Sequence, residues 1–117
     1  MKEMEIVTIS RDNYLIIEVS GRVDATSSPD FDAKFIEICN EIPEPVSMIL
    51  NMKNVEYMSS AGLRSVLKVA KYCTSKQKKL ILCQIQSAVY EVFKISGFTA
   101  LLTITDTLDG AEAAIVK

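Results

Sequence analysis

Apolar residues along the chain recur with two spacings, one typical of strands and the other typical of helices. Short runs rich in aliphatic and aromatic residues predict strands over residues 4–9, 14–20, 46–52, 80–83 and 101–104. Asp12 and Asn13 predict a hairpin turn between the first two strands, and Gly21 is expected to end the second. The run at 46–52 is mostly apolar between chain-breaking residues, which is typical of a strand buried on both faces.

Four helices are predicted between and after the later strands. The first has Ser27 or Ser28 as its expected cap and ends near Glu41, because Pro43 and Pro45 follow. Gly97 is expected to end the third helix, and Asp106 or Thr107 to cap the fourth. The inward faces of the four helices are predicted to carry, in chain order, Phe31, Phe35, Ile38 and Ile42; Leu63, Val66, Leu67 and Ala70; Val89, Val92 and Phe93; and Ala111, Ala114 and Ile115.

The predicted order is β-β-α-β-α-β-α-β-α, which indicates an α/β fold. Strands that alternate with helices are joined by right-handed crossovers and form a largely parallel sheet. The opening hairpin adds an antiparallel strand, so the sheet is expected to be mixed, with about five strands and about four helices. No linker, repeat or low-complexity stretch divides the chain, and residues 1–117 are predicted to form one domain.

Composition excludes several classes of protein. With 49% hydrophobic and 24% charged residues in 117, the chain is predicted to be a soluble globular protein. A net charge of −2 gives no attraction to nucleic acid or to anionic membranes. No apolar run reaches the roughly 20 residues of a membrane span, and the charged start is unlike a secretory signal.

The three cysteines, Cys39, Cys73 and Cys83, are widely spaced and the chain has no histidine. This pattern argues against a structural zinc site and against a disulfide framework. Buried reduced thiols, as in a cytoplasmic protein, are the expected state.

Residues 54–67 are the most informative segment for function. Ser59 and Ser60 stand at the start of a predicted amphipathic helix, with Gly62 in its first turn, after an apolar run that ends at Met52. One interpretation is that a serine simply caps the helix. The other is that a serine there is phosphorylated, because the positive end of the helix dipole stabilises an added phosphate. The two interpretations are compatible.

Enzymatic interpretations find little support. The segment is not Gly-x-Ser-x-Gly, no histidine is present to activate a serine, and a Ser–Lys dyad would need a desolvated lysine. The two common glycine-rich phosphate-binding motifs are absent. The sequence therefore predicts a protein that is not an enzyme, with no catalytic residue, no cofactor and no metal site.

Two further features carry open alternatives. Asp24 follows a predicted strand and is either a turn aspartate or part of a binding surface. Arg64, Lys68 and Lys71 share one predicted helix face, which is either solvated or a docking surface for an acidic partner. Arg64 also lies one helical turn beyond Ser60, within reach of a phosphate there.

Several segments together resemble the STAS domain family, which includes bacterial anti-sigma factor antagonists and the cytoplasmic domains of sulfate transporters. Ser-Ser-Ala-Gly-Leu at 59–63 is similar to the signature of the family. Gly-Arg-Val-Asp at 21–24 resembles the family's Gly-x-hydrophobic-Asp after the second strand. Residues 89–98 resemble its third-helix segment, and Ala111, Ala113 and Ala114 suit its closing helix. The resemblance covers essentially the whole chain.

This resemblance implies a partner-switching cycle. An unphosphorylated antagonist binds an anti-sigma factor, often also a serine kinase, and thereby frees a sigma factor. Phosphorylation of one serine breaks the complex, and a PP2C-like phosphatase restores it. The usual motif is Asp-Ser-[Ser/Thr]-Gly-Leu, so the acceptor here is Ser60, while Ser59 takes the place of the aspartate and Ala61 that of the Ser/Thr. The implied partner-binding residues are Asp24, Ser59, Ser60, Ala61, Gly62, Leu63 and Arg64.

The alternative is a STAS interaction or scaffold module that regulates a client other than a sigma pathway. A transporter domain is disfavoured because no membrane segment precedes the domain in the sequence. In either case the chain is expected to act as a monomer or weak dimer, without direct contact to nucleic acid or membrane.

Overall fold

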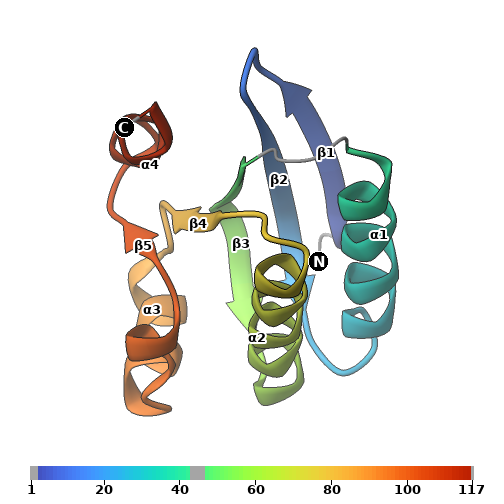
Figure 1. Ribbon diagram of the computed structural model, residues 1–117. Coiled ribbons are helices and arrows are strands. Elements are labelled where there is room, and N and C mark those ends of the chain that lie inside the picture. Colours follow the sequence, from blue (N-terminus) through green and yellow to red (C-terminus); the bar gives the residue numbers. More distant parts are fainter. Residues whose placement is uncertain (1–2, 43–46, 117) are drawn as a thin grey trace.

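A computed structural model describes residues 3–42 and 47–116 (Figure 1). The chain opens with a hairpin and then alternates helices with strands, as the sequence predicts. The elements are β1 (Glu5–Ser10), β2 (Tyr14–Val23), α1 (Ser28–Glu41), β3 (Ser47–Met58), α2 (Ser60–Ser75), β4 (Leu80–Cys83), α3 (Ser87–Ile95), the 3₁₀ helix η1 (Phe98–Leu101), β5 (Ile104–Thr105) and α4 (Leu108–Val116).

The strands form one mixed sheet in the order β1-β2-β3-β4-β5. β1 pairs with β2 in the antiparallel sense, and the other three pairs of neighbouring strands are parallel. The hairpin turn closes with a hydrogen bond from the Arg11 N–H to the Tyr14 carbonyl, 2.9 Å. The predicted α/β class, element order and mixed sheet are confirmed.

Helices cover both faces of the sheet. Successive residues of the inner strands point to opposite faces, so Ile17, Leu50 and Leu82 pack under α1, α2 and α3. Their neighbours Ile16, Ile49 and Ile81 pack on the other face with Ala111 of α4. This alternation confirms the prediction of a central strand buried on both faces. Val46, Pro43 and Pro45, to which the sequence assigned the start of that strand and the end of the preceding helix, lie outside the described residues.

Two strands run further than the sequence predicts. Gly21 does not end β2 but lies within it at φ +90°, and β2 continues to Val23. β3 does not end at Met52 but continues to Met58, with Val55 and Met58 buried. Register shifts where β3 pairs with Ser20 and Arg22 break the alternation of apolar and polar positions. The polar residues in this stretch are therefore exposed strand positions.

Of the predicted strand at 101–104, only Ile104 lies in a strand, so the prediction is wrong for its first three residues. Gly97 adopts a left-handed conformation, φ 77°, and leads into η1, so Leu101 ends a helical turn. The strand that follows, β5, holds only Ile104 and Thr105. A short apolar run after a glycine fits either structure, and pairing with β4 decides the outcome here.

The helices agree closely with the predictions. Ser27 occupies the N-cap position of α1, and the Thr107 hydroxyl oxygen accepts a hydrogen bond from the Gly110 N–H in the first turn of α4, 2.9 Å. The predicted inward residues Phe31, Phe35, Val66 and Phe93 are almost fully buried. Within residues 3–42 and 47–116, no helix is long and apolar enough to cross a membrane.

Candidate functional site

The candidate site lies at the edge of the sheet where the parallel strands β2 and β3 end and helices α1 and α2 begin (Figure 1). The Ser59 N–H donates a hydrogen bond to the Val23 carbonyl, 3.0 Å. A Cβ atom added to Gly62 would stand 2.2 Å from the same carbonyl oxygen. Only a glycine lets α2 approach the end of β2 so closely, so this residue fixes where the helix begins.

The two serines have different roles in this arrangement. Ser59 is the N-cap of α2, since its hydroxyl oxygen accepts a hydrogen bond from the Gly62 N–H, 3.3 Å, and its carbonyl accepts from Leu63. Ser60 is the first residue of the helix and is exposed. Its hydroxyl makes no hydrogen bond within the described part of the chain. Of the two serines, Ser59 therefore caps the helix, and the Ser60 side chain is exposed at the first helical position.

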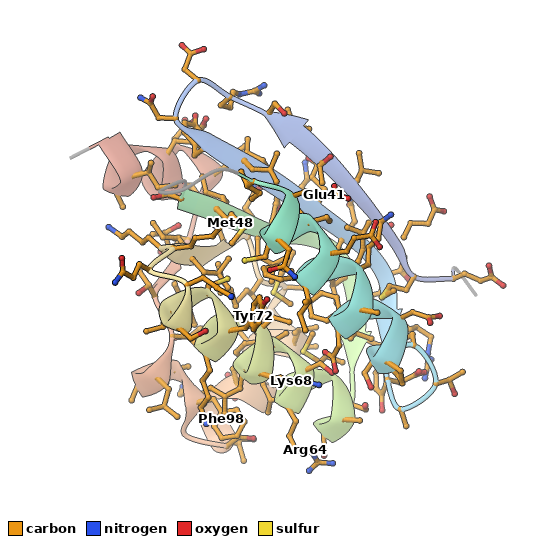
Figure 2. The ribbon with its side chains drawn as sticks, turned by 45° about the vertical axis from the view of Figure 1, so that its right-hand side comes forward. Glu41, Met48, Arg64, Lys68, Tyr72 and Phe98 are labelled. Carbon is orange, nitrogen blue, oxygen red and sulfur yellow. The ribbon has the colours of Figure 1, made fainter. Side chains whose placement is uncertain are left out.

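The first turn of α2 carries no acidic residue, so the positive end of its dipole is not offset by its own side chains. Arg64, one turn further on, is exposed. Figure 2 shows its side chain at the starting end of α2, directed away from the body of the molecule. An anion placed on Ser60 would therefore meet the helix dipole and, one turn away, a guanidinium group.

Asp24 organises the turn between β2 and α1. Its carboxylate accepts hydrogen bonds from the N–H groups of Thr26, 3.0 Å, and Ser27, 3.2 Å. The Arg22 Nε donates to the other oxygen, 3.3 Å. The Ser27 N–H, followed by the Arg22 side chain and the Thr26 N–H, holds the pKa of Asp24 below its ordinary value despite partial desolvation. Both oxygens are engaged within the turn, so Asp24 shapes this edge of the site.

Sequence reasoning missed a pair of side chains at the same edge. The Arg22 guanidinium lies over the Tyr57 ring, 4.3 Å from its centroid, on neighbouring positions of β2 and β3. Tyr57 is 44% exposed, so the stacked pair forms part of the surface. The tyrosine shortly before the serine pair could have indicated this surface pair. Because the sequence prediction ended the strand at Met52, Tyr57 was not recognised as a strand residue.

The structure brings most of the predicted residues together and separates their roles. Asp24, Ser59 and Gly62 adjoin one another through Val23, and Ala61 and Arg64 follow in the first turns of α2. Gly62 and Leu63 are buried, and Leu63 packs in the core. These two residues anchor the helix, whereas Ser60 and Arg64 offer exposed side chains.

The three cations on α2 are all exposed, but they have different neighbours. The Lys68 ammonium pairs with Asp32 of α1, 3.4 Å, and its label lies on the α1 side of α2 in Figure 2. Lys71 instead lines a groove of about 290 Å³ with Leu67, Ala70, Thr74 and Leu101. Of these three cations, only Arg64 belongs to the site.

Among the described residues, no group of three or more His, Cys, Asp or Glu side chains is placed to hold a metal ion.

Known proteins match this chain along nearly its whole length. A model of the STAS domain matches residues 5–111. A protein of Bordetella bronchiseptica, provisionally described as the anti-sigma factor antagonist BtrV, is 32% identical over 111 residues, covering 95% of this chain and 94% of its own.

Solved structures share the fold at lower identity. An anti-sigma factor antagonist from Mycobacterium paratuberculosis superposes with a TM-score of 0.87 at 17% identity, covering 98% of this chain and 96% of that one. The phosphorylated form of SpoIIAA, a Bacillus cell fate determinant, superposes with a TM-score of 0.69 at 19% identity, covering 98% of this chain and all of that one. At these identities the likeness concerns the fold alone.

Proposed function

The chain belongs to the STAS domain family, and from this premise we propose that it acts as an anti-sigma factor antagonist. The proposal draws on relatives that carry this description and match almost the whole chain. The observation that carries it is the exposed Ser60 hydroxyl at the start of α2, next to a different serine that caps the helix. Residues 1–117 are taken to be one domain that works by binding and not by catalysis.

We propose that Ser60 is the phosphorylation site of the switch. A phosphate adds about −1.5 to −2 charges at neutral pH. At the first position of α2 this charge meets the positive end of the helix dipole, and Ser59 remains free to cap the helix. Phosphorylation at this position should therefore leave the fold intact.

The same charge would oppose a partner packed over this edge. An unpaired charge buried in an interface costs about 2–5 kcal/mol, which is a thirtyfold to several-thousandfold loss of affinity. Release of the partner then needs no conformational change in this chain. The partner-binding surface is proposed to comprise the exposed Ser60 and Arg64 and the half-buried Asp24, Ser59 and Ala61, held in place by Gly62 and Leu63.

The proposed partners are an anti-sigma factor that is also the serine kinase, and a PP2C-like phosphatase that removes the phosphate. The chain is proposed to bind as a monomer or weak dimer in the cytoplasm. Membership of the family and the exposed serine at the site support this choice of partners.

Incubation with the cognate kinase and ATP, followed by phosphopeptide mass spectrometry, tests the assignment. The expected result is one phosphate on the peptide that contains Ser60, and none on the Ser60→Ala variant. The Ser59→Ala variant is the matched control and should still accept phosphate on Ser60. Modification on another residue, or none under conditions that phosphorylate a known substrate of the kinase, would reject the site.

A further inference from the structure

Cys39 and Cys73 lie together between α1 and α2, although they are far apart in the sequence. The Cys39 side chain is among the groups that raise the pKa of Cys73, so the two thiols are neighbours. The exposed fraction of Cys39 is 1% and that of Cys73 is 0%, and both belong to the same core cluster. Beside the two cysteines, the hydroxyl of Tyr72, which precedes Cys73, donates to the side-chain oxygen of Asn40, which follows Cys39, 2.6 Å. This bond fixes how the two helices face each other here.

A third group completes this cluster. Lys78 is buried, at 5% exposed, and its backbone N–H donates to the Cys73 carbonyl, 2.8 Å. Burial and the neighbouring Cys39 raise the pKa of Cys73 to about 12, while the charge of Lys78 acts in the opposite direction. The Cys73 thiol is therefore protonated in the closed structure.

We propose that Cys39 and Cys73 form an oxidative modification site, at which a peroxide joins the two sulfur atoms in a disulfide that ties α1 to α2. One thiolate attacks hydrogen peroxide, hydroxide leaves, and a sulfenic acid forms. The second thiol attacks that sulfur, the S–S bond forms and water leaves. Two thiols and one peroxide thus give one disulfide and two waters.

Access to the sulfur atoms comes from the ends of the helices. α1 ends at Glu41 and α2 at Ser75, so both cysteines lie in the last turn of their helix. Last turns open locally at a lower free energy than the whole domain does. When they close again, the oxidised sulfur meets the neighbouring thiol before it meets a second molecule.

Cys83 provides an internal comparison. It is buried on the opposite face of the sheet, in the cluster that contains Ile16, Ile81 and Ala111. The sheet separates it from the other two thiols. The site therefore predicts one specific pairing out of the three that are available to three cysteines.

The test uses the Cys83→Ser chain, which is reduced, folded and treated with hydrogen peroxide. The chain is then denatured in urea, and its free thiols are labelled with N-ethylmaleimide. The expected product is about 2 Da lighter than the reduced chain, carries no maleimide, and gives a peptide that links Cys39 to Cys73. Dithiothreitol should restore two maleimide sites. In the wild-type chain, only Cys83 should be labelled after oxidation.

Two outcomes would overturn the proposal. One is full labelling of both thiols at a peroxide dose that consumes them in the urea-denatured chain. The other is sulfinic acid or intermolecular dimers in place of the internal link.

A second measurement is the thermal midpoint. Because the bond closes a loop of roughly 35 residues, the oxidised chain should melt about 5 °C or more above the reduced chain, and the Cys39→Ser variant should show no such shift.

Discussion

At the scale of single residues, Gly62 is the position on which the site depends most. Alanine usually stabilises a helix by about 1 kcal/mol relative to glycine. Here the added Cβ would collide with the Val23 carbonyl at 2.2 Å, so Gly62→Ala should destabilise the protein. We expect a loss of about 2 kcal/mol or more in the free energy of unfolding, measured by urea denaturation.

Gly110 in the first turn of α4 is the matched control. The nearest atom to a Cβ at this position is the Thr107 hydroxyl oxygen, 3.1 Å away, which belongs to a side chain and can adjust. Gly110→Ala should therefore change the stability by less than about 1 kcal/mol in either direction. Equal effects of the two substitutions would contradict the close approach of α2 to β2.

The serine pair gives the second residue-scale prediction. Ser59→Ala removes the cap of α2 and should cost about 1 kcal/mol. Ser60→Ala removes a hydroxyl that makes no hydrogen bond within the described residues and should change the stability by less than about 0.5 kcal/mol. Thermal unfolding of the two variants in parallel is sufficient. A larger loss of stability for Ser60→Ala than for Ser59→Ala would show that Ser60, and not Ser59, caps the helix.

Asp24 gives a pH-dependent prediction. Its hydrogen bonds lower the pKa in the folded state, so the ionised form contributes stability above the unfolded pKa of about 3.9. That contribution is lost as the pH falls through the lower, folded pKa. Asp24→Asn should therefore be less stable than the wild type at pH 7, and the gap should narrow as the pH approaches 3.

Thermal midpoints of both proteins from pH 7 to pH 3 measure this gap. Asp12→Asn at the exposed hairpin turn removes the same charge elsewhere in the chain, and it separates loss of charge from loss of the hydrogen bonds in the turn. Parallel curves for the wild type and Asp24→Asn would show that the carboxylate does not organise this turn.

The sequence predicted a candidate set of site residues, and the structure shows that these residues make different contacts. Ser59 and Ser60 are the same residue type in adjacent positions, and only the hydrogen bonds that Ser59 accepts from Gly62 and Leu63 show which one caps. The pairing of Arg22 with Tyr57 depends on the register between β2 and β3. A contact between segments that are distant in the sequence cannot be predicted from the local pattern of residues.

At the scale of elements, the sequence predicted the strand segments that are apolar and buried, but it did not predict the polar extensions of strands. β4 holds the predicted residues because Leu80–Cys83 is apolar throughout and buried. β3 was predicted too short because Lys53, Asn54, Glu56 and Tyr57 are exposed and two register shifts disturb the period of two. Pairing with the end of β2 makes this segment a strand, and that pairing is a tertiary effect.

The contact between α1 and α2 gives an element-scale prediction. The Tyr72 hydroxyl donates to Asn40 across the two helices, so Tyr72→Phe should cost about 0.5–1.5 kcal/mol in the free energy of unfolding. Tyr90→Phe on α3 is the control, because the Tyr90 hydroxyl makes no hydrogen bond within the described residues and the change should be near zero. Urea denaturation of both variants measures these changes. If Tyr72→Phe did not change the free energy of unfolding, the hydrogen bond to Asn40 would not contribute to stability.

At the scale of the whole molecule, the site is placed at one edge of a sheet whose two faces are already covered by helices. The starting end of α2 is held by Gly62 and Leu63, and its length packs on α1. A charge added at Ser60 therefore meets a surface whose supporting helix is packed against the core. This arrangement suits a switch that acts by blocking contact and not by changing the fold.

The most direct test compares the wild-type chain with a chain that carries phosphoserine at position 60, by calorimetric titration against the anti-sigma factor. We expect the phosphate to weaken binding by about a hundredfold or more while the thermal midpoint stays within about 2 °C of the wild type. Equal affinity of the two chains, or a loss of affinity that follows from unfolding of the phosphorylated chain, would contradict it.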